Sequence, residues 1–211
     1  MILSESPKIQ AFNIDCMDFM RDKPDNYYEL AIVDPPYGIG VDKMGLGKGK
    51  KKTAHNNLYS DTPPVYEYFN LLKRVSKSQI IWGYNYFVNI YPMTGTCWVV
   101  WDKIQEFSGA DFELAYTSFN SPSKAFRMSR VEAYGNGTIH PTQKPIALYR
   151  WLLKNYAKPN DKILDTHGGS FSSAIACQME GFDLDICELD EDYFNDAVKR
   201  FKLNTVQEKL F

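Results

Sequence analysis

The four residues Asp34-Pro35-Pro36-Tyr37 have the types and spacing of a site that binds a planar amine. They follow the apolar run 30–33, which is typical of a buried strand. Neither proline donates a backbone hydrogen bond and each restricts the residue before it, so the strand must end in a rigid turn. That turn offers a carboxylate and a backbone carbonyl as acceptors for the two N–H groups of an exocyclic amine, and a ring for stacking. An ordinary turn with a capping aspartate is the alternative for this string taken alone.

A second strand-turn element spans residues 163–170, with the sequence ILDTHGGS. Gly168 and Gly169, placed between a strand and a helix, allow a ligand to approach the backbone closely. Glu188 follows the next apolar run, about twenty residues on, where a carboxylate that binds ribose hydroxyls is expected. Together these features predict a nucleoside-binding site, and a βα loop of small residues is the alternative for the glycine pair by itself.

Apolar runs and helical segments alternate along the chain and must position these motifs. The near-continuous apolar runs, typical of strands covered on both faces, lie at residues 30–33, 79–82, 97–101, 162–164 and 182–187. The three- and four-residue spacing of apolar side chains predicts helices over residues 65–75, 145–156, 172–179 and 192–201. This alternation predicts an α/β three-layer sandwich with a Rossmann-like, mostly parallel sheet, built as a single domain over residues 1–211.

Two segments break the alternation. Residues 41–62 are rich in lysine and glycine and show no periodic apolar pattern, which predicts a mobile surface loop. Residues 103–137 mix aromatic and basic side chains with little regular period, apart from a candidate strand over 112–116. We expect this second segment to be an insertion on the sandwich.

The two motifs occur in an order that resembles a known family. Together with Asp15-Cys16-Met17 before the first motif and His140-Pro141-Thr142-Gln143-Lys144-Pro145 before the second, they resemble the amino-group DNA methyltransferases that use S-adenosylmethionine. The order is that of the β-type members, in which the catalytic motif precedes the cofactor motif. Asp-Pro-Pro-Tyr is typical of members that act on adenine N6, and Ser-Pro-Pro-Tyr is more typical of those that act on cytosine N4. Residues 80–87, 98–103 and 111–115 further resemble the small bacterial and phage members, so the likeness spans nearly the whole chain.

The resemblance implies a role for each matching residue. In the catalytic motif Asp34, Pro35, Pro36 and Tyr37, the Asp34 carboxylate and the Pro35 carbonyl accept from the adenine amine and Tyr37 stacks on the base. The implied cofactor-binding residues are Asp15, Cys16, Thr142, Lys144, Pro145, Asp165, Thr166, His167, Gly168, Gly169, Ser170 and Glu188. Among these, Asp15 is expected beside the adenine of the cofactor, Glu188 at its ribose, and Thr142, Lys144 and Pro145 at its methionine end.

The cofactor motif departs from the family pattern D-x-F-x-G-x-G at two positions. His167 stands in place of the phenylalanine, and Phe171 stands in place of the last glycine. The affinity for the cofactor depends on how the turn accommodates them: either a bulky side chain crowds the ligand, or the local loop differs from that of the family.

The resemblance also implies double-stranded DNA with a flipped target base as the partner, a homodimer as in many β-type relatives, and the cytoplasm of a bacterial or phage-infected cell as the setting. The net charge is only -2, so overall charge does not predict a nucleic-acid partner. Local basic residues are the candidates for DNA binding, although a solvated surface is the ordinary role of any one of them. These candidates are Lys48, Lys50, Lys51, Lys52, Lys124, Arg127 and Arg130. The insertion over residues 103–137 and the Lys-rich loop are the segments that we expect to recognise the target sequence.

Other features limit the classes of function. The four cysteines form no C-x-x-C pair and no zinc-type cluster with histidine, so we expect buried thiols, no metal and a reducing compartment. The first residues lack the pattern of a signal peptide, and no apolar stretch approaches the roughly twenty residues of a membrane helix.

Three alternative functions remain open. Methylation of cytosine N4 is the nearest, because both amines present the same two hydrogens. A catalytically inactive DNA-binding protein with the same fold is compatible with the altered cofactor turn. A nicotinamide oxidoreductase is a weaker third, since its glycine-rich turn should follow the first strand of the fold.

Overall fold

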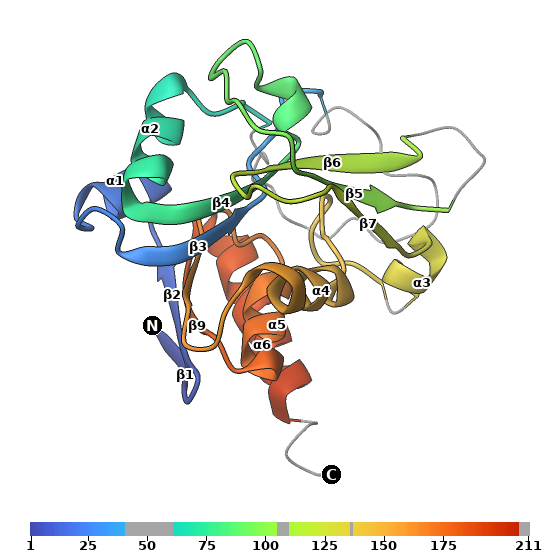
Figure 1. Ribbon diagram of the computed structural model, residues 1–211. Coiled ribbons are helices and arrows are strands. Elements are labelled where there is room, and N and C mark those ends of the chain that lie inside the picture. Colours follow the sequence, from blue (N-terminus) through green and yellow to red (C-terminus); the bar gives the residue numbers. More distant parts are fainter. Residues whose placement is uncertain (41–60, 105–109, 136, 207–211) are drawn as a thin grey trace.

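The structure is a computed structural model that describes residues 1–40, 61–104, 110–135 and 137–206 (Figure 1). In these residues the strands are β1 (Ile2–Glu5), β2 (Lys8–Asn13), β3 (Tyr28–Val33), β4 (Ser76–Trp82), β5 (Trp98–Asp102), β6 (Phe112–Thr117), β7 (Lys124–Arg127), β8 (Lys162–Asp165) and β9 (Asp183–Glu188). They form one sheet in the order β1-β2-β9-β8-β3-β4-β6-β5-β7. Residues 41–60, which make up nearly all of the Lys- and Gly-rich segment 41–62, lie outside the residues that the structure describes.

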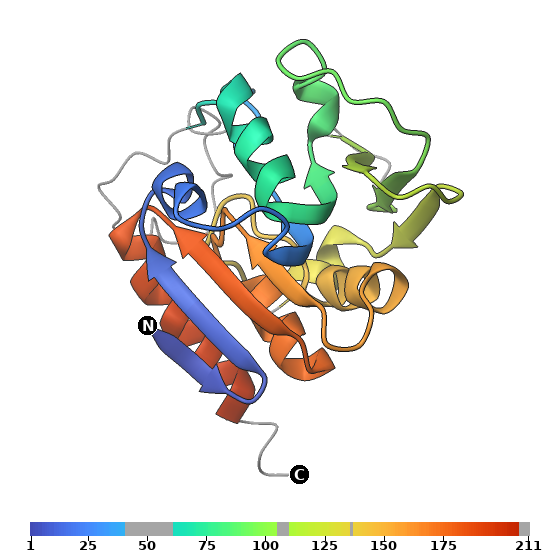
Figure 2. The same ribbon diagram turned by 60° about the vertical axis from the view of Figure 1, so that its left-hand side comes forward.

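Helices cover both faces of this sheet (Figures 1 and 2). One face carries α4 (Ile146–Tyr156), α5 (Ser172–Glu180) and α6 (Glu191–Val206), and the other carries α1 (Cys16–Arg21) and α2 (Tyr66–Val75). A short helix α3 (Arg130–Tyr134) and a 3-10 turn η2 (Tyr84–Tyr86) complete the helical elements of the described residues. Each face has its own apolar cluster between helices and sheet. The predicted α/β three-layer sandwich is confirmed.

The central strands β2, β9, β8, β3 and β4 run parallel, as the sequence predicts. Leu30 of β3 pairs with Ile163 of β8, and Ala31 pairs with Leu164. Because the strands are parallel and in this register, their carboxyl ends reach the same edge of the sheet. The turns that follow β3 and β8 are thereby brought side by side, although about 130 residues of sequence separate them.

The apolar run 97–101 forms the predicted strand, β5, but not with the predicted surroundings. β5 is parallel to β7 and antiparallel to β6, and its side chains alternate between buried Val99 and Trp101 and half-buried Trp98 and Val100. The run is therefore not covered equally on both faces. Antiparallel pairing through a connection inside residues 103–111 explains why this part of the sheet departs from the βαβ rhythm.

Segment 103–137 is also more regular than the sequence predicts. It supplies β6, β7 and α3, and β6 lies between β4 and β5 within the sheet. The segment therefore builds one end of the sheet and is not an appendage on a finished sandwich.

The other predicted elements agree with the structure to within a few residues at their ends, except α6, which extends to residue 206. Pro145 is the N-cap of α4, one position before the first turn in which we expect it. Among the described residues, no helix has the length and apolar character needed to cross a membrane.

Candidate active site

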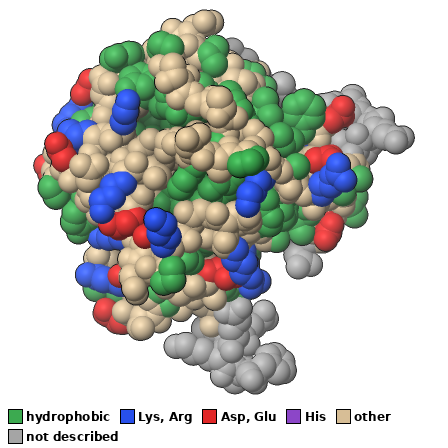
Figure 3. All heavy atoms as spheres, in the orientation of Figure 1, with side chains coloured by type: hydrophobic (Ala, Val, Ile, Leu, Met, Phe, Trp, Pro, Cys, Tyr) green, Lys and Arg blue, Asp and Glu red, His purple; other side chains and the backbone are tan. Residues whose placement is uncertain are grey.

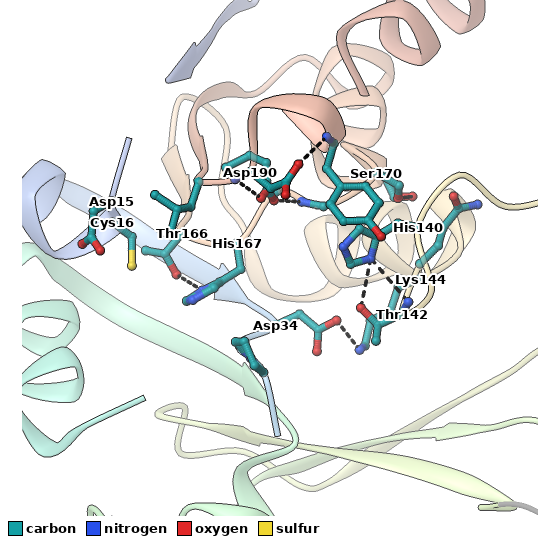
Figure 4. Close-up of a pocket in the computed structure, with 18 of the residues that line it drawn as sticks. Asp15, Cys16, Asp34, His140, Thr142, Lys144, Thr166, His167, Ser170 and Asp190 are labelled. Atoms are coloured by element: carbon teal, nitrogen blue, oxygen red, sulfur yellow. Dashed lines mark hydrogen bonds and ion pairs between the residues drawn. The ribbon is translucent and has the colours of Figure 1, made fainter. Parts of the chain in front are cut away.

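A cavity of about 660 Å³ opens at the carboxyl ends of the central strands (Figure 4). Its volume lies within the range of small-molecule sites, about 300–1,000 Å³. The predicted site residues that line it are Asp15, Cys16, Asp34, Pro36, Thr142, Lys144, Thr166, His167, Gly168, Gly169, Ser170 and Glu188. Pro35, Tyr37, Pro145 and Asp165 are absent from this lining. Asp15 and Cys16 lie at the opposite end of the cavity from Thr142 and Lys144, with His167 and Asp34 between them.

The turn after β3 holds Asp34 at the cavity wall. One carboxylate oxygen, Oδ1, accepts from the Tyr37 hydroxyl at 2.6 Å, and the other, Oδ2, lies 2.5 Å from the Lys144 ammonium. Burial and the neighbouring Glu113 raise the pKa of Asp34, while Lys144 opposes that rise. Asp34 is thus a desolvated acceptor that is fixed by one donor on each oxygen.

The Tyr37 ring is held by close packing. It stacks on Tyr86 with 5.3 Å between ring centroids and 21° between planes. Gly83, with φ +67°, lies against it so closely that a Cβ there would be 2.1 Å from Tyr37 Cε1. Only glycine allows this approach. Tyr86 remains 45% exposed, so an aromatic surface continues from Tyr37 to the outside of the protein.

A buried charge cluster surrounds this turn, and sequence reasoning missed half of it. Lys144 Nζ also lies 3.1 Å from Glu113 Oε2 and donates to the Tyr37 hydroxyl at 3.0 Å. Lys103 Nζ lies 2.7 Å from the other oxygen of Glu113. The two ammonium groups lower the pKa of Glu113 to about 2 against the opposing effect of burial. Lys144 was expected only at the cofactor, yet it makes its ion pairs with the catalytic turn and with β6.

The turn after β8 forms the floor of the cavity. Asp165 is buried and accepts from the Ser173 hydroxyl at 2.5 Å and from the His167 backbone N–H at 3.0 Å. Burial raises the pKa of Asp165 to about 7. Gly169, with φ +51°, donates its N–H to Glu188 Oε2 at 2.7 Å, which joins the turn to the end of β9. This network fixes the backbone against which a ligand would lie.

The two departures in this turn have different consequences. Phe171 is fully buried with φ +57° and packs on Phe194 at 5.7 Å between centroids, so its side chain fills the core and does not line the cavity. His167 does line the cavity, and its Nδ1 lies 2.9 Å from the Thr166 hydroxyl. Burial lowers the pKa of His167 to about 4, which keeps its imidazole neutral at pH 7. The phenylalanine therefore does not crowd a ligand, while the histidine gives the cavity wall a neutral polar ring.

The amino-terminal end of the cavity is built by the start of α1. The Asp15 side chain caps this helix and accepts from the Met17 and Asp18 N–H groups. Cys16 is half-buried, unlike the other three cysteines, which are buried as expected. Burial raises the pKa of Cys16 to about 12, so its thiol stays protonated and lines the wall as a small apolar group.

Further lining residues were not predicted to bind a ligand. They are Ile14, Thr62, Pro64, His140, Gln143, Tyr149, Ser172, Leu189, Asp190, Glu191 and Tyr193. Burial lowers the pKa of His140 to about 4, and its ring packs edge-on against Tyr193. The sequence offered one indication that His140 and Gln143 lie at the site: both stand in the run 140–145, which also contains the predicted residues Thr142, Lys144 and Pro145. The structure brings Asp190 and Tyr193 to the site because they follow β9.

The predicted DNA-binding residues fall in three places. Lys48, Lys50, Lys51 and Lys52 lie outside the described residues. Arg127 ends β7 and is paired with Asp102, next to the charge cluster at the end of β5, and Arg130 begins α3. Lys124 begins β7 and donates to Asn155 near the end of α4, away from the cavity. On the face that Figure 3 shows, acidic and basic side chains are interspersed and do not gather by sign.

The donor set of the cavity fits a nucleoside cofactor better than a metal ion. The described residues contain no group of three or more His, Cys, Asp or Glu side chains arranged to hold a metal. The carboxylates of Asp15 and Glu188 line it, and carboxylates accept from the hydroxyl and amine groups of an adenosine. Gly168 also lines it, and packing requires a glycine there, since a Cβ would come within 2.6 Å of the buried Phe171 ring.

The fold is an α/β sandwich with a mostly parallel sheet, of the architecture found in solved S-adenosylmethionine-dependent methyltransferases. A family model, N6_N4_Mtase, described as DNA methylase, matches residues 99–199. The chain is 25% identical over 201 residues to "Putative methylase YubD" of Escherichia coli (strain K12), covering 88% of this chain and 87% of that protein.

Solved structures agree with this fold. The M1.HpyAVI complex with S-adenosylmethionine has a TM-score of 0.60 and 18% identity, covering 91% of this chain and 98% of that one. The PvuII DNA methyltransferase, which is cytosine-N4-specific, has a TM-score of 0.62 and 11% identity, covering 94% and 90%. TTHA0409 of Thermus thermophilus, complexed with S-adenosyl-L-methionine, has a TM-score of 0.54 and 14% identity, covering 93% and 95%. Fold, family model and cavity together support an amino-group DNA methyltransferase.

Proposed function

We propose that this protein transfers the methyl group of S-adenosylmethionine to the N6 amino group of an adenine flipped out of double-stranded DNA. One observation carries the proposal: Asp34, a buried acceptor in the turn after β3, lines the same cavity as the glycine turn after β8. An acceptor for an amine and a cradle for a nucleoside cofactor thus share one space. The family model supports methyl transfer to DNA, and the likeness in fold is compatible with it.

The chain's residues act by positioning. S-adenosylmethionine, when bound, supplies a methyl carbon on a positively charged sulfur; the carbon–sulfur bond breaks as the carbon–nitrogen bond forms, leaving a neutral thioether. Asp34 and the Pro35 carbonyl accept from the two amine hydrogens and direct the nitrogen lone pair away from the base ring. The methylated nitrogen then releases one proton, for which the Asp34 carboxylate is the nearest acceptor. Such orientation removes much of the barrier to a two-substrate reaction.

The flipped base needs a surface to replace the stacking that it loses in the duplex, a loss of a few kcal/mol. Tyr37, which the resemblance places on the base, is stacked on Tyr86 and does not line the cavity, so the exposed Tyr86 ring is the aromatic face that we propose for the base. Arg127 and Arg130, at the same end of the sheet, are proposed to contact the DNA near the target base, with segment 103–137 taking part in sequence recognition. Lys48, Lys50, Lys51 and Lys52 are proposed to contact phosphates, and Lys124 is the weakest candidate because it points to α4.

Methylation of cytosine N4 is the second candidate. The likeness to the cytosine-N4-specific PvuII enzyme favours it, and both amines offer two hydrogens to the same acceptors. The aspartate at the start of the Asp-Pro-Pro-Tyr motif favours adenine.

The test is to incubate the protein with S-adenosylmethionine carrying a labelled methyl group and with unmethylated double-stranded DNA of mixed sequence, and then to analyse the nucleosides. Label in N6-methyladenine is expected, and label in N4-methylcytosine would establish the second candidate. DNA without label, together with no binding of S-adenosylmethionine in a calorimetric titration, would refute both candidates and indicate an inactive DNA-binding protein. DNA without label but with cofactor binding would indicate an enzyme whose recognition sequence was missing from the DNA. The Asp34→Ala variant is the control for a contaminating activity.

A further inference from the structure

We propose that Lys144, anchored by Glu113 and Lys103, is a positioning residue that holds the Asp34 carboxylate in place and in its charged form. The inference rests on the proposed function, in which Asp34 accepts hydrogen bonds from the target amine. It gives Lys144 a role different from the closing of the cofactor site that the resemblance implies, and it gives roles to two residues, Lys103 and Glu113, for which the sequence predicted none.

The geometry around Lys144 supports this role. Its side chain is 3% exposed, and its ammonium has three oxygen partners, Asp34 Oδ2, Glu113 Oε2 and the Tyr37 hydroxyl, at 2.5, 3.1 and 3.0 Å. An ammonium donates three hydrogen bonds, so these partners use its full capacity. The lysine is therefore fixed from three sides, and Asp34 is fixed with it.

Glu113 and Lys103 complete the cluster. Lys103 Nζ, on a residue that is 8% exposed, pairs with the second oxygen of Glu113, so two cations and two anions balance. Aromatic rings back both ammonium groups: Trp101 lies 5.2 Å from Lys103 Nζ, and Trp82 lies 5.3 Å from Lys144 Nζ. Burial of four charges is tolerated only when they are paired in this way. Glu113 is the link, since it contacts both lysines.

The charge of Lys144 matters because Asp34 lies in surroundings that otherwise favour its protonated form. A protonated carboxyl donates a hydrogen bond from one oxygen and cannot accept both from the amine and from its neighbours as a carboxylate does. Burial and the nearby Glu113 raise the pKa of Asp34, and Lys144 is the main opposing charge. The titratable groups that face this carboxyl from the packed elements are Lys144, Glu113, Tyr37, Tyr134, Tyr149 and Asp165.

The Lys144→Met variant tests the proposal, because methionine has similar length and no charge. Loss of an adjacent opposite charge raises the pKa of a carboxyl by about 1–3 units. We therefore expect the acidic limb of the pH profile of kcat to move up by about 1–3 pH units, with activity partly recovered at high pH. The affinity for S-adenosylmethionine, measured by calorimetric titration, should change less than about threefold. Weakened cofactor binding with an unmoved pH profile would overturn the proposal and leave Lys144 as a cofactor residue.

Two further variants control for damage to the fold. Lys144→Met combined with Glu113→Gln removes one charge of each sign, so the cluster stays balanced while Asp34 still lacks its cation. Its pH profile should lie between those of the wild type and of Lys144→Met, because the repulsion by Glu113 is also gone. Lys154→Met removes an exposed lysine from the same helix region and should leave the profile unchanged. A double variant that titrates like the wild type would contradict the proposed role.

The result for the wild type separates this inference from the proposed function. If the wild type methylates no DNA, the proposed function fails, and the role of Lys144 is then judged without turnover. Carbon-13 NMR of the side-chain carboxyl groups, with Asp34 assigned from Asp34→Asn, follows the titration directly. In that measurement Lys144→Met must raise the pKa of Asp34, and an unchanged pKa would overturn the inference.

Discussion

Replacement of Asp34 by asparagine tests the catalytic site with little change in shape. Asparagine keeps one oxygen acceptor but removes the charge and replaces the second acceptor with an N–H₂ donor, which faces either the Tyr37 hydroxyl or the Lys144 ammonium. Loss of a positioned acid–base group lowers rates by about 10²–10⁴-fold, equivalent to about 3–5 kcal/mol in the activation barrier. We expect kcat for methyl transfer to fall within that range, with S-adenosylmethionine bound as tightly as by the wild type.

The effect of Asp34→Asn on stability can be worked out from the same contacts. Lys144 keeps Glu113 at 3.1 Å, but Glu113 then faces both Lys144 and Lys103, so one buried positive charge is left without its own anion. Removal of one partner of a buried ion pair costs about 3–5 kcal/mol, which for a chain of this length lowers the melting temperature by about 6–20 °C. The exposed pair of Asp25 with Arg74 provides the control, because Asp25→Asn should lose at most about 1 kcal/mol and keep full activity.

Single-turnover assays at about 25 °C with saturating cofactor, together with calorimetric titration of the cofactor, separate these effects. An Asp34→Asn variant with more than about a tenth of the wild-type kcat would refute the role of Asp34 as acceptor. A variant that lost cofactor binding as well as turnover would place Asp34 in cofactor binding and not in chemistry.

Three other predictions follow from the described residues. Burial lowers the pKa of His140 and His167 to about 4, so the unfolded chain binds more protons than the folded one below about pH 6.5. The free energy of unfolding should therefore fall as the pH drops from about 6.5 to 4, by up to about 3 kcal/mol per histidine. In denaturant titrations, the variant with both His140→Gln and His167→Gln should show a weaker dependence of this free energy on pH. Gly83→Ala should displace the Tyr37 ring and lower the rate of methyl transfer at least tenfold. Gly181→Ala is the control, because Gly181 also has positive φ but no atom lies within 4 Å of its Cβ position, so this variant should lose stability and keep its activity. Equal activities of the two variants would contradict the prediction. Phe171→Gly should relieve the strain of positive φ but leave a cavity, for a net loss of about 2–4 kcal/mol in the free energy of unfolding, measured by thermal denaturation. The affinity for the cofactor, measured by calorimetry, should not change. Tighter cofactor binding would mean that the phenylalanine obstructs the site.

The sequence predicted the parts of the fold that local pattern determines. The parallel strands, the four longer helices and the two motif turns follow from apolar spacing and from prolines and glycines, which act over a few residues. It did not predict that β6 lies between β4 and β5, because pairing order depends on contacts between residues far apart in the chain. The strands β1 and β2 and the short helix α1 were also missed, since each is too short to show a clear period of apolar residues.

The same limit explains which site residues were found. Asp34 and Glu188 stand in short strings whose types and spacing carry their own physical explanation, so they were identified from sequence alone. Lys103 and Glu113 stand in no such string. They meet only because β5 and β6 pair antiparallel with Trp101 opposite Glu113, which places both residues near the end of β3. Lys103 stands two positions beyond an apolar run and Glu113 stands near the start of a candidate strand, which are ordinary places for charged residues on a solvated surface. Nothing in the local sequence distinguishes the two from such surface residues.

Strand pairing holds the two halves of the site together, and the charge cluster joins the catalytic turn to a further part of the sheet. β3 and β8 are neighbours, and adjacent strands lie about 4.8 Å apart, so the turns that carry Asp34 and Asp165 are fixed relative to each other by backbone hydrogen bonds. Lys144 comes from the segment that leads into α4, and Glu113 comes from β6, two strands away from β3. The ion pairs therefore join the catalytic turn to the end of the sheet that carries Arg127 and α3.

That connection predicts a dependence of the chemistry on the DNA sequence. If DNA binds at that end of the sheet, movement of β6 on binding would reach Asp34 through Glu113 and Lys144. In Glu113→Gln, the rate of methyl transfer should therefore depend less on the correct target sequence, while the affinity of the protein for the cofactor changes less. Comparison of turnover on cognate and single-mismatch duplexes, once the recognition sequence is known, measures that dependence, and an unchanged ratio would show that the cluster holds the acceptor without coupling it to DNA.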